Sequence, residues 1–175
     1  MIYLAVGVVI AVVLTLLNLV LMFGVIRRLR ELQSRVDAAP SVLPDAGLPA
    51  GSPAPELTAT TVSGAEVSSV DPARPTLIGF FSPGCAPCAD RIPEFVDYAG
   101  TGVAKVAVVV TDLPAEGDDY VRRLSAVDVT VQPGQEAWVQ GFAVTSYPTL
   151  CLVSSDGVVL GSGNTFGDLP TLSTV

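Results

Sequence analysis

The sequence predicts an α/β domain with a mixed central sheet flanked by helices, preceded by one transmembrane helix. Two apolar strand-like runs, Thr76–Phe81 and Val103–Val110, are separated by a helical pattern, which is typical of a parallel βαβ unit. A later apolar run, Leu150–Val153, leads through a Ser-Asp-Gly turn into a second short strand, which makes an antiparallel hairpin. The uncharged run Ile2–Ile26 predicts the membrane helix, because it is long enough to cross a bilayer.

The N-terminal run is interpreted as an uncleaved, single-pass anchor in the cell membrane. No lysine or arginine precedes it, and no small-residue cleavage site follows it directly, so a signal peptide is disfavoured. Arg27 and Glu31, and Glu31 and Arg35, are spaced to pair on a helix, which predicts that the helix continues to about Val36. Residues 1–36 are therefore predicted as anchor and juxtamembrane helix.

The charges around this run bear on the side of the membrane that the domain faces. Arg27, Arg28, Arg30 and Arg35 follow the run, while no basic residue precedes it. By the positive-inside rule the C-terminal side is cytoplasmic, and the arginines are expected to contact lipid headgroups of the bilayer.

Residues 37–52 are predicted as a flexible linker and residues 53–175 as the domain. The linker is rich in alanine, proline, glycine and serine and has no helical or strand period. From Ser52 onward the chain carries 14 acidic and 5 basic residues. This acidic balance argues against nucleic acid as a partner, since such binding needs a basic face.

The remaining elements follow in order from periodicity. Leu57–Ser69 reads as a hairpin, with Ser63-Gly64 as its turn. A helix beginning near Cys88 presents an apolar stripe at residues 92, 95, 96 and 99, and Pro93 interrupts it. Three further helices are predicted at residues 118–126, 135–142 and 166–173, and one strand is predicted at residues 127–131.

Cysteine spacing supplies the main chemical signal. The segment Gly84-Cys85-Ala86-Pro87-Cys88 lies between a predicted strand and a predicted helix. At a helix N-terminus, unpaired N–H groups and the helix dipole favour a thiolate, and Pro87 is suited to a first helical turn. We therefore predict Cys85 as the nucleophile and Cys88 as the resolving thiol.

A metal site and a purely structural thiol pair are the alternatives for these cysteines. Zinc requires four ligands, but the chain has no histidine and only one further cysteine, Cys151. Redox chemistry is favoured over both, and no metal or organic cofactor is expected.

The chain resembles the membrane-tethered redoxins of the thioredoxin fold, the TlpA-like and MauD-like thiol–disulfide oxidoreductases. Four pieces carry the resemblance: the entry Gly51–Leu57, the strand and CxxC motif of Leu77–Cys88, the segment Gly141–Thr149, and the turn Ser155–Gly157. The combination of a CxxC with a Tyr-Pro-Thr about sixty residues later is the most specific part.

The resemblance implies a thioredoxin-like fold with a cis peptide at Tyr147-Pro148 beside the two cysteines. It further implies that Tyr147 and Pro148 dock the substrate and that Gly84, Ala86 and Pro87 form the redox loop. The partners would be protein thiol or disulfide substrates and a dithiol protein that donates or accepts electrons. Most relatives work outside the cytoplasmic membrane, whereas the arginines favour the cytoplasmic side, so the side stays open.

The chain departs from the family pattern at two positions. Gly84 stands where relatives usually carry a tryptophan or a similar residue, and Gly79 stands where thioredoxins carry a buried aspartate that helps proton transfer. Cys151, in a predicted buried strand, is interpreted as an inert core thiol.

Two other functions stay open at this point. A peroxiredoxin-like peroxidase shares the Ala54-Pro55 entry but normally uses a single peroxidatic cysteine rather than a CxxC. A non-enzymatic assembly factor or metallochaperone on a redoxin scaffold would need further metal ligands, as in copper-delivery relatives with CxxxC and a histidine.

Overall fold

The computed structural model describes residue 15, residues 46–98 and residues 102–171 of the chain. Within these residues the strands and helices follow one another in the order β1, β2, β3, α2, β4, α3, β5, α4, β6, β7 and η1. The strands are β1 (Thr58–Thr60), β2 (Glu66–Ser68), β3 (Thr76–Phe81), β4 (Ala104–Val110), β5 (Asp128–Gln132), β6 (Thr149–Val153) and β7 (Val159–Gly163). The helices are α2 (Ala86–Val96), α3 (Pro114–Arg123), α4 (Ala137–Gly141) and the 3-10 helix η1 (Phe166–Asp168).

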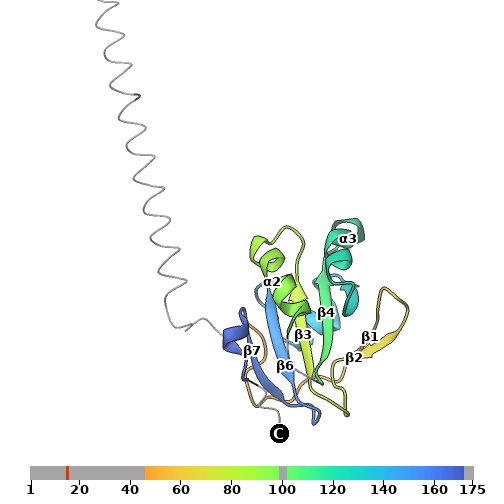
Figure 1. Ribbon diagram of the computed structural model, residues 1–175, viewed down its shortest axis with the longest axis vertical. Coiled ribbons are helices and arrows are strands. Elements are labelled where there is room, and N and C mark those ends of the chain that lie inside the picture. The colour runs from red at the N-terminus through yellow and green to blue at the C-terminus, as the bar shows by residue number, and fades with distance from the viewer. Residues whose placement is uncertain (1–14, 16–45, 99–101, 172–175) are drawn as a thin grey trace, which may run out of the picture. The chain divides into compact units, whose positions relative to one another are not determined.

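A five-stranded mixed sheet in the order β5-β4-β3-β6-β7 forms the centre of the domain (Figure 1). Strands β3, β4 and β5 are parallel, while β6 runs antiparallel to β3, and β7 runs antiparallel to β6. All six residues of β3 are buried, because helices cover both faces of the sheet at this central strand. The predicted βαβ unit and C-terminal hairpin are confirmed.

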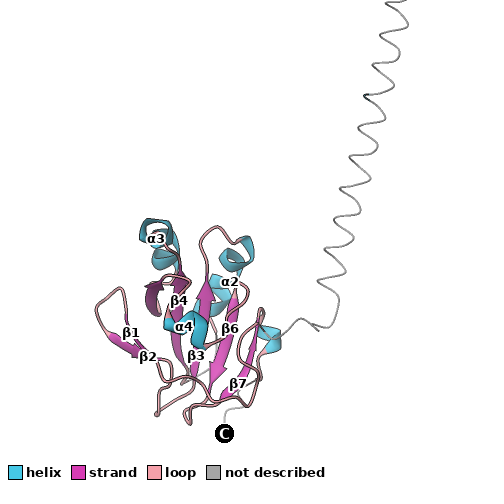
Figure 2. Ribbon diagram, turned by 180° about the vertical axis from the view of Figure 1, so that it is seen from behind, coloured by secondary structure: helices cyan, strands magenta, loops and turns pink. Residues whose placement is uncertain are grey.

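Helices lie on both faces of this sheet. Helices α2 and α3 cover one face, and α4 lies on the other (Figure 2). Side chains of β3 alternate accordingly: Leu77 and Phe81 pack with α2 and α3, while Ile78 and Phe80 pack with α4. The resulting two-faced core is that of a thioredoxin-like α/β fold.

The ends of three elements differ from the sequence-based prediction. Helix α3 begins at Pro114 rather than at residue 118, because proline is favoured in a first helical turn and needs no N–H partner there. The last helix is a short 3-10 turn, Phe166–Asp168, and Leu169 is already extended. Pro170 disfavours the helical conformation for the residue before it, which explains this early end. The CxxC helix begins at Ala86, two residues before the predicted start.

Residues 46–52, which the sequence places in the linker, contact the domain in the structure. The N–H of Gly51 bonds the Val159 carbonyl, and the N–H of Val159 bonds the Ser52 carbonyl, both along β7. Ser162 donates a hydrogen bond to the Leu48 carbonyl at 2.7 Å. This segment therefore covers the outer edge of β7.

The predicted membrane anchor, the juxtamembrane helix and most of the linker lie outside the described residues, apart from Thr15. Across the part of the chain that the structure describes, no helix combines the length and hydrophobicity that a membrane span requires.

Candidate active site

Cys85 lies where the central strand passes into its helix. It follows β3 by four residues and is the N-cap of α2, with an extended backbone. The residue before it, Gly84, has φ of +79°, a left-handed conformation that glycine adopts without strain. Ala86 and Pro87 form the exposed first turn of the helix. Glycine at position 84 thus suits the turn that aims Cys85 at the helix N-terminus.

The two cysteines of the motif are in contact but differ in exposure. The backbone N–H of Cys88 donates a hydrogen bond to Cys85 Sγ at 3.3 Å. Cys85 is partly exposed, whereas Cys88 is fully buried, and both are free thiols. Burial, assisted by the Cys85 sulfur and opposed by the Ser82 backbone, raises the pKa of Cys88 to about 12. One thiol is therefore reachable by a partner, and the other is held behind it as a neutral group.

The segment before β6 brings a second backbone group to Cys85. The Tyr147-Pro148 peptide bond is cis, as the resemblance implies. The Cys85 thiol lies 3.5 Å from the Tyr147 carbonyl oxygen, to which it can donate. Burial and the nearby charge of Cys88 raise the pKa of the Tyr147 phenol, so its side chain is neutral near pH 7. The structure thus brings Tyr147 and Pro148 beside the cysteine pair.

Helix α3 contributes two contacts to α2 that sequence reasoning missed. The Tyr120 hydroxyl donates to the Cys85 carbonyl at 3.1 Å, and the Arg123 guanidinium donates to the Ala89 carbonyl. Pro93 gives a local signal for the second contact, because proline at this position cannot supply the N–H that Ala89 would normally accept. No local signal identifies Tyr120, which is 35 residues from its partner.

The position of the missing aspartate is closed by aromatic rings. A Cβ placed on Gly79 would lie 2.6 Å from the Phe81 ring and 2.7 Å from the Phe95 ring. These two rings pack edge to face with centroids 5.3 Å apart. A carboxylate therefore does not fit at position 79 without displacing part of the core beside Cys88.

Cys151 lies on the opposite face of the sheet from the redox pair. It packs with Ile78 and Phe80, whereas Cys88 packs with Leu77 and Phe81. Burial raises the pKa of Cys151 to about 12. Since the sheet separates it from Cys85, the interpretation of Cys151 as a core thiol fits its location.

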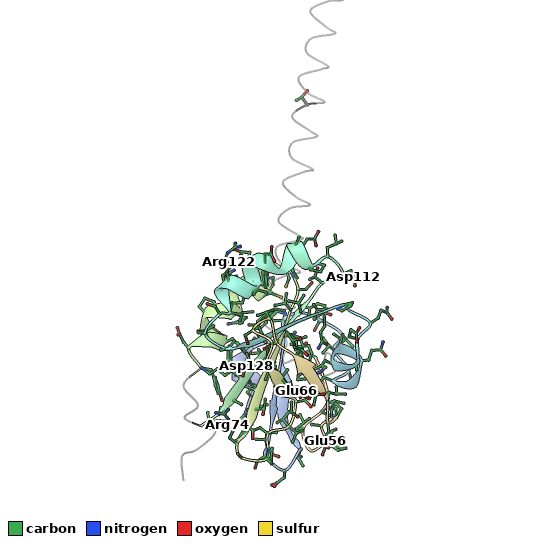
Figure 3. All side chains as sticks on the ribbon, turned by 90° about the vertical axis from the view of Figure 1, so that its right-hand side faces the viewer. Glu56, Glu66, Arg74, Asp112, Arg122 and Asp128 are labelled. Atoms are coloured by element: carbon green, nitrogen blue, oxygen red, sulfur yellow. The ribbon has the colours of Figure 1, made fainter. Side chains whose placement is uncertain are left out.

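One cavity of the domain is remote from these groups. It has a volume of about 590 Å³ and is lined by residues that include Arg74, Lys105 and Asp128, two of which are labelled in Figure 3. It lies where β4 and β5 begin, while Cys85 follows the end of the parallel strand β3, so the two are at opposite ends of the sheet. Among the described residues, no group of three or more acidic or cysteine side chains is placed to hold a metal ion.

Comparison with known proteins shows which proteins the chain is similar to. No protein-family model matches the chain. It is 28% identical over 146 residues to the methylamine utilization protein MauD of Methylobacillus flagellatus, which covers 82% of this chain and 71% of that protein. The chain is thus similar to a MauD-like redoxin over most of its length.

Solved structures agree with the thioredoxin-like fold of the chain. The thioredoxin domain of a thiol-disulfide oxidoreductase from Bacteroides vulgatus matches with a TM-score of 0.60 and 19% identity, covering 70% of this chain and 93% of that chain. A putative thioredoxin from Neisseria meningitidis matches with a TM-score of 0.54 and 27% identity, covering 65% of this chain and 82% of that chain. The expected class, an oxidoreductase of the thioredoxin fold, is confirmed at that level.

Proposed function

We propose that this chain exchanges thiols and disulfides with protein substrates through its Cys-Ala-Pro-Cys dithiol. The observation that carries the proposal is the pairing of one accessible and one buried thiol at a helix N-terminus. The Cys88 N–H points at Cys85 Sγ, where it stabilises the thiolate that attacks the substrate.

In the reducing direction, the Cys85 thiolate attacks one sulfur of a substrate disulfide. The substrate S–S bond breaks, one substrate thiolate leaves, and a mixed disulfide forms between Cys85 and the other substrate sulfur. Cys88 then loses its proton and attacks Cys85 Sγ, which releases the second substrate thiolate and leaves a Cys85–Cys88 disulfide. Two electrons have passed to the substrate, and a separate dithiol protein restores the reduced pair. The oxidising direction is the same sequence reversed.

We assign substrate docking to Tyr147 and Pro148. Their support is position: the Tyr147 carbonyl is 3.5 Å from Cys85 Sγ, so a substrate chain that reaches the thiol also reaches this segment. A protein substrate needs a surface rather than a deep cavity. The described cavities are lined by residues from other parts of the domain, which agrees with a protein substrate. The redox loop is formed by Gly84, Ala86 and Pro87.

We further propose that the domain is tethered to the cell membrane by residues 1–36. Support comes from the uncharged run and the arginines that follow it. Tethering restricts the substrates to proteins that reach the bilayer surface.

A mixed-disulfide trap tests the exchange mechanism. Replacing Cys88→Ser in the full chain prevents resolution, so partners should accumulate as adducts on a non-reducing gel after acid quenching of cells. The adducts should vanish in the Cys85→Ser, Cys88→Ser double variant. Folded Cys88→Ser protein that forms no Cys85-dependent adduct would contradict the proposal and favour a non-enzymatic scaffold. Peroxide consumption that requires Cys85 but not Cys88 would instead indicate a peroxidase.

A further inference from the structure

The carbonyl oxygen of Cys85 accepts two hydrogen bonds from different parts of the fold. One is the helical bond from the Ala89 N–H, at 3.2 Å, and the other comes from the Tyr120 hydroxyl, at 3.1 Å. The first is required by any α-helix, but the second is not. Tyr120 is therefore an additional donor at the residue that carries the exposed thiol.

Tyr120 is a neutral donor held in place by its surroundings. Its side chain is 6% exposed, and burial together with the nearby charges of Cys88 and Cys85 raises the pKa of its phenol. The Arg123 guanidinium lies 6.0 Å from the centre of its ring. The phenol thus keeps its proton over the pH range in which thiols react.

Helix α3 holds α2 at two carbonyls one helical turn apart. Tyr120 contacts Cys85, and Arg123 contacts Ala89, whose usual donor is missing because residue 93 is proline. Arg123 is three positions after Tyr120, so both side chains lie on one face of α3. The two contacts fix the first turns of α2 against α3.

We propose that Tyr120 is a positioning residue for Cys85, holding the N-cap of α2 so that the Cys85 sulfur meets the Cys88 N–H. The proposal rests on Cys85 being the nucleophile. Without the hydroxyl, the Cys85 carbonyl dipole is less compensated and the first turn is free to shift, and both effects disfavour a thiolate at Cys85.

The test must separate the effect of Tyr120 from the effects of the other titratable groups around the cysteine pair. Cys88 comes from α2, Tyr147 comes from the segment before β6, and Asp112 acts on Tyr147 from the loop before α3. Figure 3 shows Asp112 at the opposite end of α3 from Arg122. None of these groups is altered by a change of Tyr120 to phenylalanine, which removes only the hydroxyl.

The test is the pH profile of Cys85 alkylation in the full chain purified in mild detergent, with the modified cysteine identified by mass spectrometry. Tyr120→Phe should slow alkylation at neutral pH by about three- to tenfold and move the profile to higher pH, as expected for one lost hydrogen bond. The equilibrium with a glutathione couple should shift toward the disulfide by a similar factor. Tyr98→Phe is the matched control, because Tyr98 stacks on Phe166 away from the pair, and it should match wild type within about twofold.

A Tyr120→Phe profile that superimposes on wild type would overturn the proposal. If this variant does not fold, a crystal structure of the wild-type protein still decides, because a Tyr120 hydroxyl that does not contact the Cys85 carbonyl oxygen would overturn the proposal. The result is distinguishable from failure of the proposed function: a Cys88→Ser chain with Tyr120 intact that traps no partner would contradict exchange, while the alkylation profile still reports on Tyr120.

Discussion

At the scale of single residues, the site depends on unequal environments for two identical side chains. Cys85 is partly exposed at a helix N-terminus, while Cys88, one helical turn later, has no exposed surface. Burial penalises the charged form of a thiol, so the pKa of Cys88 is raised while its neutral form is stabilised. The two thiols therefore differ in how readily a partner can reach them.

The raised pKa of Cys88 predicts a pH-dependent resolving step. The thiolate of Cys88 is the attacking form, and with a pKa of about 12 its fraction grows about tenfold per pH unit between pH 7 and 9. The rate at which Cys88 resolves a mixed disulfide between Cys85 and glutathione should therefore rise by the same factor. Stopped-flow measurement of glutathione release from the preformed adduct checks this. A rate that levels off within this range would show that another group takes the proton from Cys88.

At the scale of elements, the contact between β3 and α2 determines what position 79 can hold. Phe81 of β3 and Phe95 of α2 close over Gly79 and fill the volume in which a side chain would stand. The same packing buries Cys88 and Ile92 against the sheet. The space at position 79, where thioredoxins carry a carboxylate, is thus filled here by two aromatic rings.

This packing predicts that position 79 does not tolerate a side chain. Gly79→Ala should lower the free energy of unfolding by about 1–3 kcal/mol, because the new methyl group overlaps two buried rings. Gly134→Ala, where the nearest atom to a new Cβ is 3.9 Å away, should change it by less than about 0.5 kcal/mol. Urea denaturation of both variants checks the prediction, and equal stabilities would argue against closed packing at Gly79.

At the scale of the whole domain, both edges of the sheet are covered. The loop after β1 bonds β5 through the Val62 N–H and the Val129 carbonyl, and residues 51 and 52 bond β7. Covered edges discourage unspecific strand pairing with other chains. The partly exposed thiol of Cys85, beyond the end of β3, is then the group that we expect a partner to contact.

The proposed tether predicts where that thiol meets its partners. The four arginines after the apolar run predict a cytoplasmic domain, so a membrane-impermeant maleimide should label Cys85 only after cells are lysed. Cys85→Ser provides the background, and the full chain should stay in the membrane pellet after carbonate extraction. Labelling in intact cells would place the domain outside the membrane, in agreement with the family resemblance and against the charge rule.

Local sequence patterns predicted the sheet and the CxxC helix, because apolar runs and helix capping act over a few residues. The Tyr147-Pro148 segment was predicted from the family resemblance. Element ends were less accurate, as at Pro114 and Leu169, where neighbouring prolines moved the boundary. The contact of residues 46–52 with β7 was not foreseen, since a segment without periodicity reveals no partner.

The sequence by itself determined the fold class, the redox motif and the residues expected to carry it, because each of these is written in short-range spacing. Only the tertiary structure decided that Tyr120 reaches Cys85, that aromatic rings close over Gly79, and that Cys151 lies across the sheet from Cys88. These are contacts between residues distant in the chain. They arise when packing brings separate elements together, and no local period encodes them.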